Sequence, residues 1–399
     1  MCMDHYGKFD DKRILIWGYG HEGKSTEQFL KTYCSPRSFS VFEGKREDIV
    51  EDDYDYIIKS PGIVMHEDKS KYTSQTQIFL ECFSKCTVGI TGTKGKSTTS
   101  ALLYHVLRAA GKDAYLLGNI GEPCLDHFGD MTDSAIAVFE MSCHQLEHIN
   151  VSPHIAVFLN LYEEHLDYYG TFDRYAAAKL NIARFQGEDD LLFAGSNVSS
   201  IPGNAKRAII DPDTVPEYDL KILGRHNMVN AHFVSLIASN VFHVDDNTIK
   251  NALKSFDGLD HRLSHIGCVN GIDCYDDSIS TIPGATIQAL SSVENAGTVL
   301  IGGMDRGISY DTLIDFINVN RQYNYIFSYD SGKRIYESIE HTDNCYYEPD
   351  LKSAVTLGLS ITPAGKALIL SPASASYGYF KNFEERGRVF ASLVGLGSK

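Results

Sequence analysis

Residues 87–98 read TVGITGTKGKST: an apolar run, then a glycine-containing turn, then the start of a helix-like segment that extends to about residue 112. Such a turn points backbone N–H groups at a phosphate, and the helix N-terminus adds a positive dipole. Lys96 would reach the β- and γ-phosphates, and Ser97 would offer its hydroxyl to Mg²⁺. The strict phosphate-loop pattern has glycine where this chain has Ile90, so a turn that merely caps a helix is the alternative. The strand–loop–helix context favours a nucleoside triphosphate site.

Short apolar runs alternate with amphipathic segments on both sides of this turn. The runs that we interpret as strands are RILIW (13–17), SFSVFE (38–43), AYLLGN (114–119), AIAVFEM (135–141), IAVFLNL (155–161), TVLIGG (298–303) and ALILSPA (367–373). Strands separated by helices imply parallel sheets whose ligands bind at the carboxyl ends of the strands. The sequence therefore predicts an α/β protein, and breaks in the pattern divide it into units at residues 1–86, 87–258 and 259–399.

Composition narrows the class of protein. The chain of 399 residues has 52 acidic and 36 basic side chains, a formal charge of −16, which disfavours nucleic-acid and anionic-membrane binding. No apolar run approaches the ~20 residues of a membrane span, and the polar first residues do not resemble a signal peptide. The nine cysteines are scattered, without a CxxC pair, as in reduced intracellular thiols. We expect a cytoplasmic protein that binds neither nucleic acid nor membrane.

Three further residues could accompany the phosphate turn. Glu140 ends one predicted strand and His165 follows the next, so both would face the crevice beside the turn, where a metal could bind. Either residue alone is more often an ordinary ion-pair partner or a surface histidine. Lys179 lies in the small, apolar middle of a helix that Thr171 could cap. Periodicity alone favours a lysine that extends to water over one held at an anionic site.

A second glycine motif lies near the N-terminus. Gly18, Gly20 and Gly23 form GxGxxG after a predicted strand, and Glu43 ends the next strand twenty residues later. This spacing is the outline of a dinucleotide fingerprint, although any nucleotide diphosphate can use such a turn. Close packing of strand and helix is the structural alternative.

Ten strings along the chain resemble the Mur ligases, most closely the MurD branch, which joins glutamate to UDP-N-acetylmuramoyl-L-alanine. In order, they are GITGTKGKSTT, GNIG, FEMSCHQLE, LNLYEEHLDYYG, YAAAKL, GRHNMVNA, GLDHR, DDSIST, GGMDRG and LSPASASYGYFKNFEERG. The resemblance covers nearly the whole chain. It implies a Rossmann-like N-terminal domain for the UDP-sugar, a central phosphate-loop ATPase domain and a Rossmann-like C-terminal domain for glutamate. The NAD interpretation of the first glycine turn becomes the runner-up.

The resemblance assigns site residues position by position. Residues matching the UDP-substrate site are Gly18, Tyr19, Gly20, His21, Glu43, Lys45, Ser60, Asn119, Ser142 and Gln145. Those matching the ATP site are Gly92, Thr93, Lys94, Gly95, Lys96, Ser97, Thr98, Asn227, Asn230, Arg262 and Asp277. Those matching the glutamate site are Thr281, Arg306, Ser376, Tyr377 and Phe383. Metal ligands would be Ser97, Glu140, His165 and a carbamylated Lys179, and the catalytic residues Lys96, His165 and Lys179.

The implied activity is an ATP-dependent acid–amino-acid ligase of cytoplasmic peptidoglycan synthesis, and hence of cell-wall biogenesis, cell shape and division. ATP and Mg²⁺, at two sites, are the implied cofactors, and UDP-N-acetylmuramoyl-L-alanine and glutamate the substrates of a monomeric enzyme. The carboxylate would be activated as an acyl phosphate, a reaction that needs Mg²⁺ and Lys96 against charge repulsion and exclusion of water.

Two positions depart from the better-known family pattern: Ile279 and Arg306 stand where it has lysines. Arginine grips a carboxylate as a fork and not as a point charge, whereas Ile279 removes a cation. D-glutamate is the expected substrate, with L-glutamate as the alternative. A folate-extending ligase of the same superfamily is disfavoured by the N-terminal glycine-turn domain, and a non-catalytic nucleotide-binding regulator by the intact Lys96, Glu140, His165 and Lys179.

Overall fold

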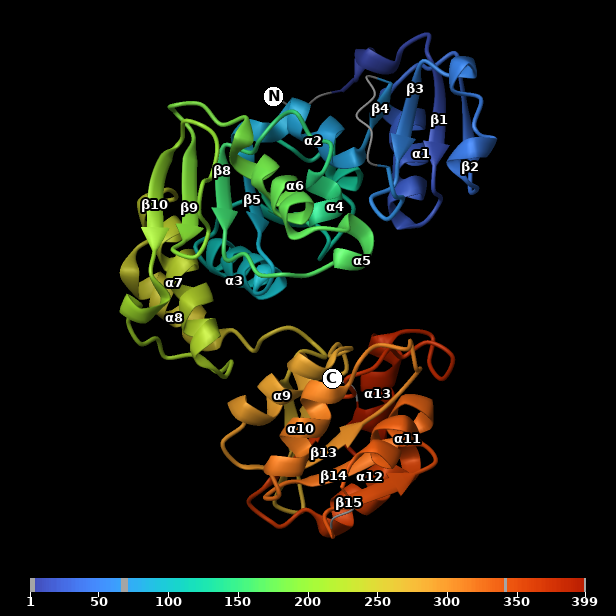
Figure 1. Ribbon diagram of the computed structural model, residues 1–399. Coiled ribbons are helices and arrows are strands. Elements are labelled where there is room, and N and C mark those ends of the chain that lie inside the picture. Colours follow the sequence, from blue (N-terminus) through green and yellow to red (C-terminus); the bar gives the residue numbers. More distant parts are fainter. Residues whose placement is uncertain (1–3, 66–70, 341–342, 398–399) are drawn as a thin grey trace. The chain divides into compact units, whose positions relative to one another are not determined.

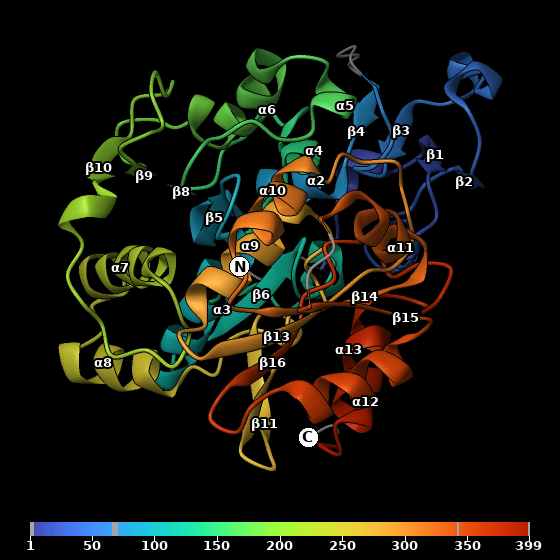
Figure 2. The same ribbon diagram turned by 60° about the horizontal axis from the view of Figure 1, so that its bottom comes forward.

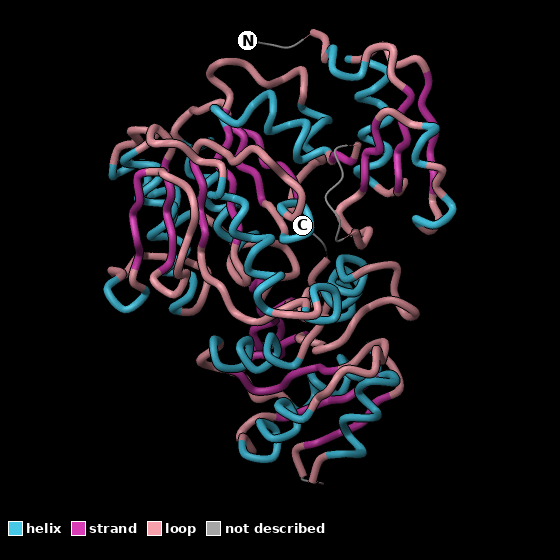
Figure 3. Tube along the Cα trace, turned by 45° about the horizontal axis from the view of Figure 1, so that its top comes forward, coloured by secondary structure: helices cyan, strands magenta, loops and turns pink. Residues whose placement is uncertain are grey.

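The computed structural model describes residues 4–65, 71–340 and 343–397. Strands and helices alternate along the chain (Figure 1), and the strands, magenta in Figure 3, form three sheets in these ranges. The chain divides into two compact units, Met1–Leu220 with Arg225–Phe256 and Lys221–Gly224 with Asp257–Lys399. The first unit contains two sheets and the second contains one.

The first sheet is parallel, with strand order β2-β1-β3-β4. Its elements are β1 (Arg13–Trp17), α1 (His21–Tyr33), β2 (Ser38–Phe42), β3 (Tyr56–Lys59) and β4 (Tyr72–Thr73), with short 3-10 helices at Gly7–Phe9, Arg46–Asp48 and Glu51–Asp53. Ile14, Leu15 and Ile16 are all buried, because β1 is paired on both sides and covered on both faces.

The second sheet is also parallel, with order β10-β9-β8-β5-β7-β6. Its strands are β5 (Thr87–Thr91), β6 (Ala114–Gly118), β7 (Ile136–Glu140), β8 (Ile155–Phe158), β9 (Leu191–Gly195) and β10 (Lys206–Ile210). Its helices are α2 (Gln75–Phe83), α3 (Lys96–Ala109), α4 (Cys143–Leu146), α5 (Leu166–Tyr169), α6 (Phe172–Arg184), α7 (Arg225–Asn240) and α8 (Asp246–Ser255), with 3-10 helices at Ser84–Cys86, Cys124–His127 and Pro212–Thr214. The central strand β5 lies between β7 and β8, so these three strands end at the same edge.

Local signals set the ends of the helices that frame this edge. Gly111 follows α3 with a left-handed φ of 70°, which terminates the helix without strain. The Thr171 hydroxyl accepts the Arg174 N–H at 3.4 Å and caps α6, as the sequence predicts.

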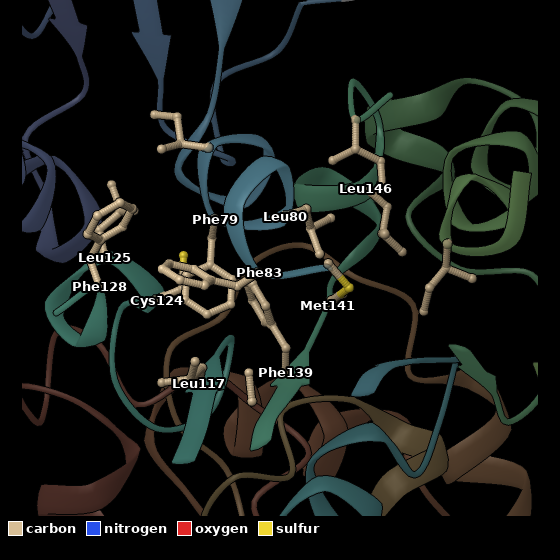
Figure 4. Close-up of a cluster of buried hydrophobic side chains, with 14 of the residues drawn as sticks. Phe79, Leu80, Phe83, Leu117, Cys124, Leu125, Phe128, Phe139, Met141 and Leu146 are labelled. Atoms are coloured by element: carbon tan, nitrogen blue, oxygen red, sulfur yellow. The ribbon is translucent and has the colours of Figure 1, made fainter. Parts of the chain in front are cut away.

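One hydrophobic core joins the first two sheets. Ile14 and Ile58 from the first sheet belong to the same buried cluster as Phe79 and Phe139 from α2 and β7. In Figure 4, aromatic rings of α2 lie between the two sheets, and the Phe79 and Phe139 ring centroids are 5.6 Å apart. Each such ring contributes about 2–3 kcal/mol by leaving water. This shared core explains why the two sheets form one compact unit.

The third sheet has order β11-β12-β16-β13-β14-β15 and is parallel except for the β11–β12 hairpin. Its elements are β11 (Ser264–Val269), β12 (Ile272–Asp276), α9 (Pro283–Ser292), β13 (Ala296–Ile301), α10 (Asp311–Val319), β14 (Asn324–Ser328), α11 (Tyr329–Ser338), β15 (Cys345–Glu348), α12 (Leu351–Ile361), β16 (Ala367–Leu370) and α13 (Phe383–Leu393). Asn270 and Gly271 turn the hairpin with φ of 54° and 79°, the signs that a tight two-residue turn requires. Helices α9, α10 and α11 cover one face, and α12 and α13 cover the other (Figure 2).

The predicted α/β class with mostly parallel sheets is confirmed. One sheet falls within each predicted segment, while the boundaries at residues 86/87 and 258/259 stay predictions. Every cysteine in the described ranges is a free thiol. Within those ranges, no helix combines the length and the apolar character needed to cross a bilayer.

Candidate active site

The phosphate turn, residues 92–95, joins β5 to α3 and is tightly packed. Gly95 has a left-handed φ of 86°, and a Cβ there would lie 2.7 Å from Asn230 Oδ1. A Cβ on Gly92 would lie 3.0 Å from the Leu159 Cβ. Only glycine fits both positions, and the open backbone that results is what a phosphate needs for close approach.

Asn160, just after β8, holds the turn in place. Its Oδ1 accepts the Lys94 N–H at 2.9 Å, its Nδ2 donates to the Lys94 carbonyl at 3.0 Å, and its own carbonyl accepts the Thr93 N–H at 2.9 Å. The Thr93 hydroxyl lies 2.9 Å from the donating Tyr162 N–H and 3.1 Å from the Tyr175 hydroxyl. The turn is therefore preformed by the protein's own hydrogen bonds. Sequence reasoning missed Asn160, although it lies within the predicted strand 155–161.

Two lysines converge on one carbonyl of this turn. Lys96 Nζ donates to the Gly92 and Thr93 carbonyls at 3.0 and 3.1 Å, and Lys179 Nζ donates to the Gly92 carbonyl at 2.7 Å. Lys179 is almost fully buried, contrary to the solvent-reaching alternative that helix periodicity favoured. In the described part of the chain, neither ammonium has a carboxylate within 4 Å.

Burial shifts the titration of both amines. Loss of solvation, and secondarily the Lys96 charge, lower the pKa of Lys179 to about 7. Loss of solvation also lowers the pKa of Lys96, against the opposing attraction of Glu140. An anion placed between the two nitrogens would supply the missing counter-charge, and a triphosphate is an anion of that kind.

Glu140 ends β7 beside the turn, with a fully buried carboxylate. Its Oε1 accepts the Asn119 Nδ2–H at 2.8 Å, while its Oε2 has no hydrogen-bond partner in the described ranges. A buried carboxylate oxygen without a donor is costly unless a cation or a donor from a ligand satisfies it. This orphaned oxygen fits the predicted magnesium ligand. Asn119, predicted to contact the substrate, also orients this carboxylate.

His165 lies on the other side of the turn, after β8. Its φ of 56° is left-handed, and its ring packs 5.4 Å from the His144 ring and 6.1 Å from the Tyr175 ring. The imidazole is about half exposed, with Nε2 4.0 Å from Glu164 Oε2. In the ranges that the structure describes, no three His, Cys, Asp or Glu side chains gather as a metal site. A metal here would therefore need Ser97, phosphate oxygens or water beside Glu140 and His165.

The first glycine turn lies at the carboxyl edge of the first sheet. A Cβ on Gly18 would lie 2.6 Å from Ser60 Oγ, and the Ser60 hydroxyl donates to the Gly18 carbonyl at 3.2 Å. Gly20, in contrast, faces open space. The Tyr19 hydroxyl donates to Glu27. The strand order brings the predicted residues after β1, β2 and β3 to this edge: Gly18, Tyr19, Gly20, His21, Glu43, Lys45 and Ser60.

Ser142 and Gln145 form a brace between the two sheets. The Ser142 N–H donates to Gln145 Oε1 at 2.9 Å, and the Gln145 N–H donates to Ser142 Oγ at 3.2 Å, a reciprocal cap on α4. Gln145 Nε2 donates to Glu22 Oε1 at 3.0 Å, reaching α1 beside the first glycine turn. Burial raises the pKa of the Glu22 carboxyl, against the lowering effect of this hydrogen bond. Glu22 escaped sequence analysis because no local pattern marks it.

Two residues predicted for the ATP site, Asn227 and Asn230, lie on α7. Both Asn227 and Asn230 are buried, and Asn230 Nδ2 donates to Asn227 Oδ1 at 3.1 Å. Because Asn230 packs against Gly95, the structure brings this pair to the phosphate turn.

The other predicted residues lie at strand ends of the second unit. Asp277 follows β12, and its carboxylate accepts the Ser280 hydroxyl at 2.6 Å, the Ser371 hydroxyl at 2.7 Å and the Leu263 N–H at 3.1 Å. Burial raises the pKa of Asp277 to about 6. Arg306 Nη2 donates to the Thr281 carbonyl at 2.9 Å, so these two predicted glutamate ligands lie together.

The remaining glutamate candidates differ in exposure. Ser376 is buried, whereas Tyr377 is 62% exposed and free to contact a ligand. Phe383 begins α13, its carbonyl accepts the Ser278 hydroxyl at 2.8 Å, and its ring lies 6.1 Å from that of His261. Arg262, a predicted ATP contact, is exposed.

Comparison with known proteins identifies the family. Residues 90–207 match the model of the Mur ligase middle domain. The chain is 30% identical to the UDP-N-acetylmuramoylalanine–D-glutamate ligase of Streptococcus agalactiae, over 96% of each chain. It is also 30% identical to the UDP-N-acetylmuramoyl-L-alanine–L-glutamate ligase of Salinispora tropica, over 96% of this chain and 97% of the relative. The chain belongs to the Mur ligase family. It is an ATP-dependent amide ligase of the MurD type, as the sequence predicted.

Solved Mur ligases share its fold. The MurF ligase of Thermotoga maritima, solved in complex with ADP, superposes with a TM-score of 0.65 at 14% identity, covering 98% of each chain. The UDP-N-acetylmuramate–alanine ligase MurC of the same organism gives a TM-score of 0.60 at 18% identity, covering 96% of this Mur ligase and 98% of MurC.

Proposed function

We propose that this Mur ligase joins D-glutamate to UDP-N-acetylmuramoyl-L-alanine, in the cytoplasmic synthesis of peptidoglycan precursors. ATP is consumed, and ADP and phosphate are released. The observation that carries the proposal is the combination, around one preformed turn, of the partly buried Lys96 ammonium without a nearby carboxylate, the buried Lys179 amine, and a buried carboxylate oxygen without a donor. A triphosphate with its cation would satisfy the Lys96 charge and the carboxylate oxygen.

Carboxylate activation then follows from the positions of these groups. A substrate carboxylate oxygen attacks the γ-phosphorus, the bond to the β,γ-bridging oxygen breaks, and ADP leaves. Lys96, released from the Gly92 and Thr93 carbonyls, would neutralise charge on the transferring phosphoryl group. The amine of glutamate next attacks the acyl phosphate, loses a proton, and expels phosphate.

The metal ligands would be Glu140 Oε2, His165 and the Ser97 hydroxyl, at up to two Mg²⁺ sites. Mg²⁺ supplies charge neutralisation between the carboxylate and the triphosphate. Asn119 holds the other oxygen of Glu140, so the free oxygen is oriented before any cation arrives.

Lys179 is proposed to be carbamylated. With a pKa of about 7, a large share of this amine is neutral at pH 7.5, and a neutral amine adds to CO₂, losing a proton and becoming a carbamate. The new oxygens would replace a cation by a metal ligand. A Lys179→Ala variant is expected to lose activity and to recover part of it with added short-chain acids. Full activity without them would contradict the modification.

The substrates are assigned by segment. Residues 1–86 would hold the UDP-sugar at the edge with Gly18 and Ser60, residues 87–258 would bind ATP, and residues 259–399 would bind glutamate. Arg306 and Thr281 support the last assignment, since they are joined by a hydrogen bond and Arg306 is exposed. We further propose that the enzyme works as a monomer.

Phosphate release tests the function directly. Purified enzyme is incubated with ATP, UDP-N-acetylmuramoyl-L-alanine and either D- or L-glutamate. Turnover with D-glutamate alone is expected. Turnover with L-glutamate alone supports the alternative, which is favoured by the Salinispora relative and by Ile279, where a lysine would otherwise stand. Turnover with neither enantiomer overturns the proposal.

A further inference from the structure

The loop after β13, residues 302–309, is held by an ion pair between two residues that the sequence analysis did not assign to the site. Asp305 lies in this loop, and Arg334 lies on α11, the helix that packs on β14 and β15 (Figure 2). Arg334 Nη2 donates to Asp305 Oδ1 at 2.8 Å, and Arg334 Nε lies 2.7 Å from Asp305 Oδ2. This two-point fork fixes both distance and orientation, which a single contact does not.

The same two side chains also fix the backbone of the loop. Asp305 Oδ1 accepts the Gly307 N–H at 2.9 Å, and Arg334 Nη2 donates to the Ile308 carbonyl at 2.7 Å. The guanidinium carbon of Arg334 lies 4.7 Å from the centre of the Tyr310 ring, a cation–π distance. The turn at residues 305–308 is thus held at its side chain, its amide and its carbonyl.

Arg306 lies inside this clamped turn and points out of it. It is flanked by Asp305 and by Gly307, whose φ of 71° is left-handed. Glycines at 302, 303 and 307 give the loop wide conformational freedom when nothing restrains it. Arg306 itself is exposed, and its hydrogen bond to the Thr281 carbonyl uses one Nη2 donor and leaves other N–H groups for a ligand.

We propose that Asp305 and Arg334 are positioning residues that orient Arg306 toward a carboxylate of the amino-acid acceptor. This inference rests on the proposed glutamate ligase function. It also accounts for the arginine at 306: a planar fork binds a carboxylate well only when its plane is fixed, whereas a lysine works as a point charge. The Asp305–Arg334 pair fixes the backbone from which that plane is set.

The test compares acceptor binding with the binding of the other substrates. Arg334→Gln and Asp305→Asn are each expected to raise KM for glutamate about fivefold to tenfold, with KM for ATP, KM for the UDP-sugar and kcat changed less than twofold. Arg334→Lys, which keeps the charge but loses the fork, should give an intermediate KM. Lys333→Gln, on the same helix and paired with Glu337 at 4.0 Å, is the matched control and should leave KM unchanged.

A cycle with Arg306 shows whether the pair acts through it. Arg306→Met alone should raise KM for glutamate more than either positioning variant, and adding Arg334→Gln to it should have no further effect. An equal further rise in the Arg306→Met background would overturn the proposal, as would an unchanged KM in Arg334→Gln. Melting temperatures of all variants identify any that fold poorly. If Arg334→Gln is one of these, the KM of Arg334→Lys for glutamate tests the proposal instead. Absence of turnover by the wild-type enzyme with either glutamate enantiomer would instead refute the function.

Discussion

The phosphate turn of the first unit and the strand-end loops of the second unit differ in whether their charged side chains have partners of opposite charge or hydrogen-bond donors. Around the turn, Lys96 and Lys179 share the Gly92 carbonyl as an acceptor and have no carboxylate within 4 Å in the described ranges, and one oxygen of Glu140 has no donor there. In the second unit, the buried Asp277 accepts three hydrogen bonds, and Arg334 grips Asp305 in a fork.

This difference indicates which charged groups take part in the reaction and which only position other residues. Unsatisfied buried charge lowers the stability of the empty protein and is recovered when a ligand of opposite charge binds. Satisfied charge holds loops in place and contributes to shape. Substitutions at the turn should therefore reduce turnover while sparing or improving stability, whereas substitutions in the second unit should change binding or stability more modestly.

The largest effect is expected for Lys96→Met. Removing the cation should lower kcat at least about 10³-fold, because charge on the transferring phosphoryl group loses its fixed counter-charge. The melting temperature should not fall, since a desolvated ammonium is replaced by an apolar chain of similar length. Phosphate release and thermal melting measure both. Lys254→Met, on α8 of the same unit, removes an exposed ammonium 2.6 Å from Asp219 and is the matched control. An unchanged kcat in Lys96→Met would contradict the proposed role of the unpaired charge at the turn.

Glu140→Gln should lower turnover about 10²-fold and raise the Mg²⁺ concentration needed for half-maximal activity. The amide keeps an acceptor for Asn119 but removes the charge at the orphaned oxygen. Activity is titrated against MgCl₂ for the wild type, this variant and Asn119→Ala. The last should show a smaller change, because it leaves the carboxylate in place. An unaltered Mg²⁺ requirement in Glu140→Gln would exclude it as a ligand.

The sequence allowed prediction of those site residues that lie at or just after the end of a strand. The turn at 92–95 and His165 follow strands, and Glu140 is the last residue of one. Parallel pairing of β7, β5 and β8 brings these strand ends to one edge. The burial of Lys179 was not predictable from helix periodicity, because it depends on the packing of α6 against β5 and β8.

Two contacts between distant side chains, Glu22–Gln145 and Asp305–Arg334, also could not be predicted, because they depend on packing. Glu22 and Gln145 are 123 positions apart, and Asp305 and Arg334 are 29 apart, so no window along the sequence shows that they meet. Their residue types are also common on surfaces, where charges are ordinarily solvated. Only the assembled sheets bring such pairs together.

The lowered pKa of Lys179 at the turn should make the stability of the protein increase with pH. Lys179 has a pKa of about 7 in the folded protein and near ~10.4 when unfolded, so between these values the unfolded chain binds more protons. The free energy of unfolding of ligand-free protein should therefore increase from pH 7 to pH 10, by on the order of 2–4 kcal/mol. Lys179→Met should remove the part of this rise that Lys179 contributes, leaving the part that comes from Lys96, and should be more stable than the wild type at pH 7. Denaturant unfolding in CO₂-depleted buffer measures it. A wild-type curve parallel to that of the variant would contradict the assignment.

Asp277 should give the opposite slope, with a smaller amplitude. Its folded pKa of about 6 exceeds the unfolded value near ~3.9, so between these values the folded protein binds more protons. The stability of the second unit should therefore fall as pH rises from 4 to 6, by on the order of 1–3 kcal/mol. Asp277→Asn removes the titration, and the serine hydroxyls can reorient to suit the amide. Calorimetry of wild type and variant between pH 4 and 7 compares the slopes. If both proteins lose stability equally over this range, Asp277 is not the titrating group, and the contrast with the phosphate turn rests on geometry alone.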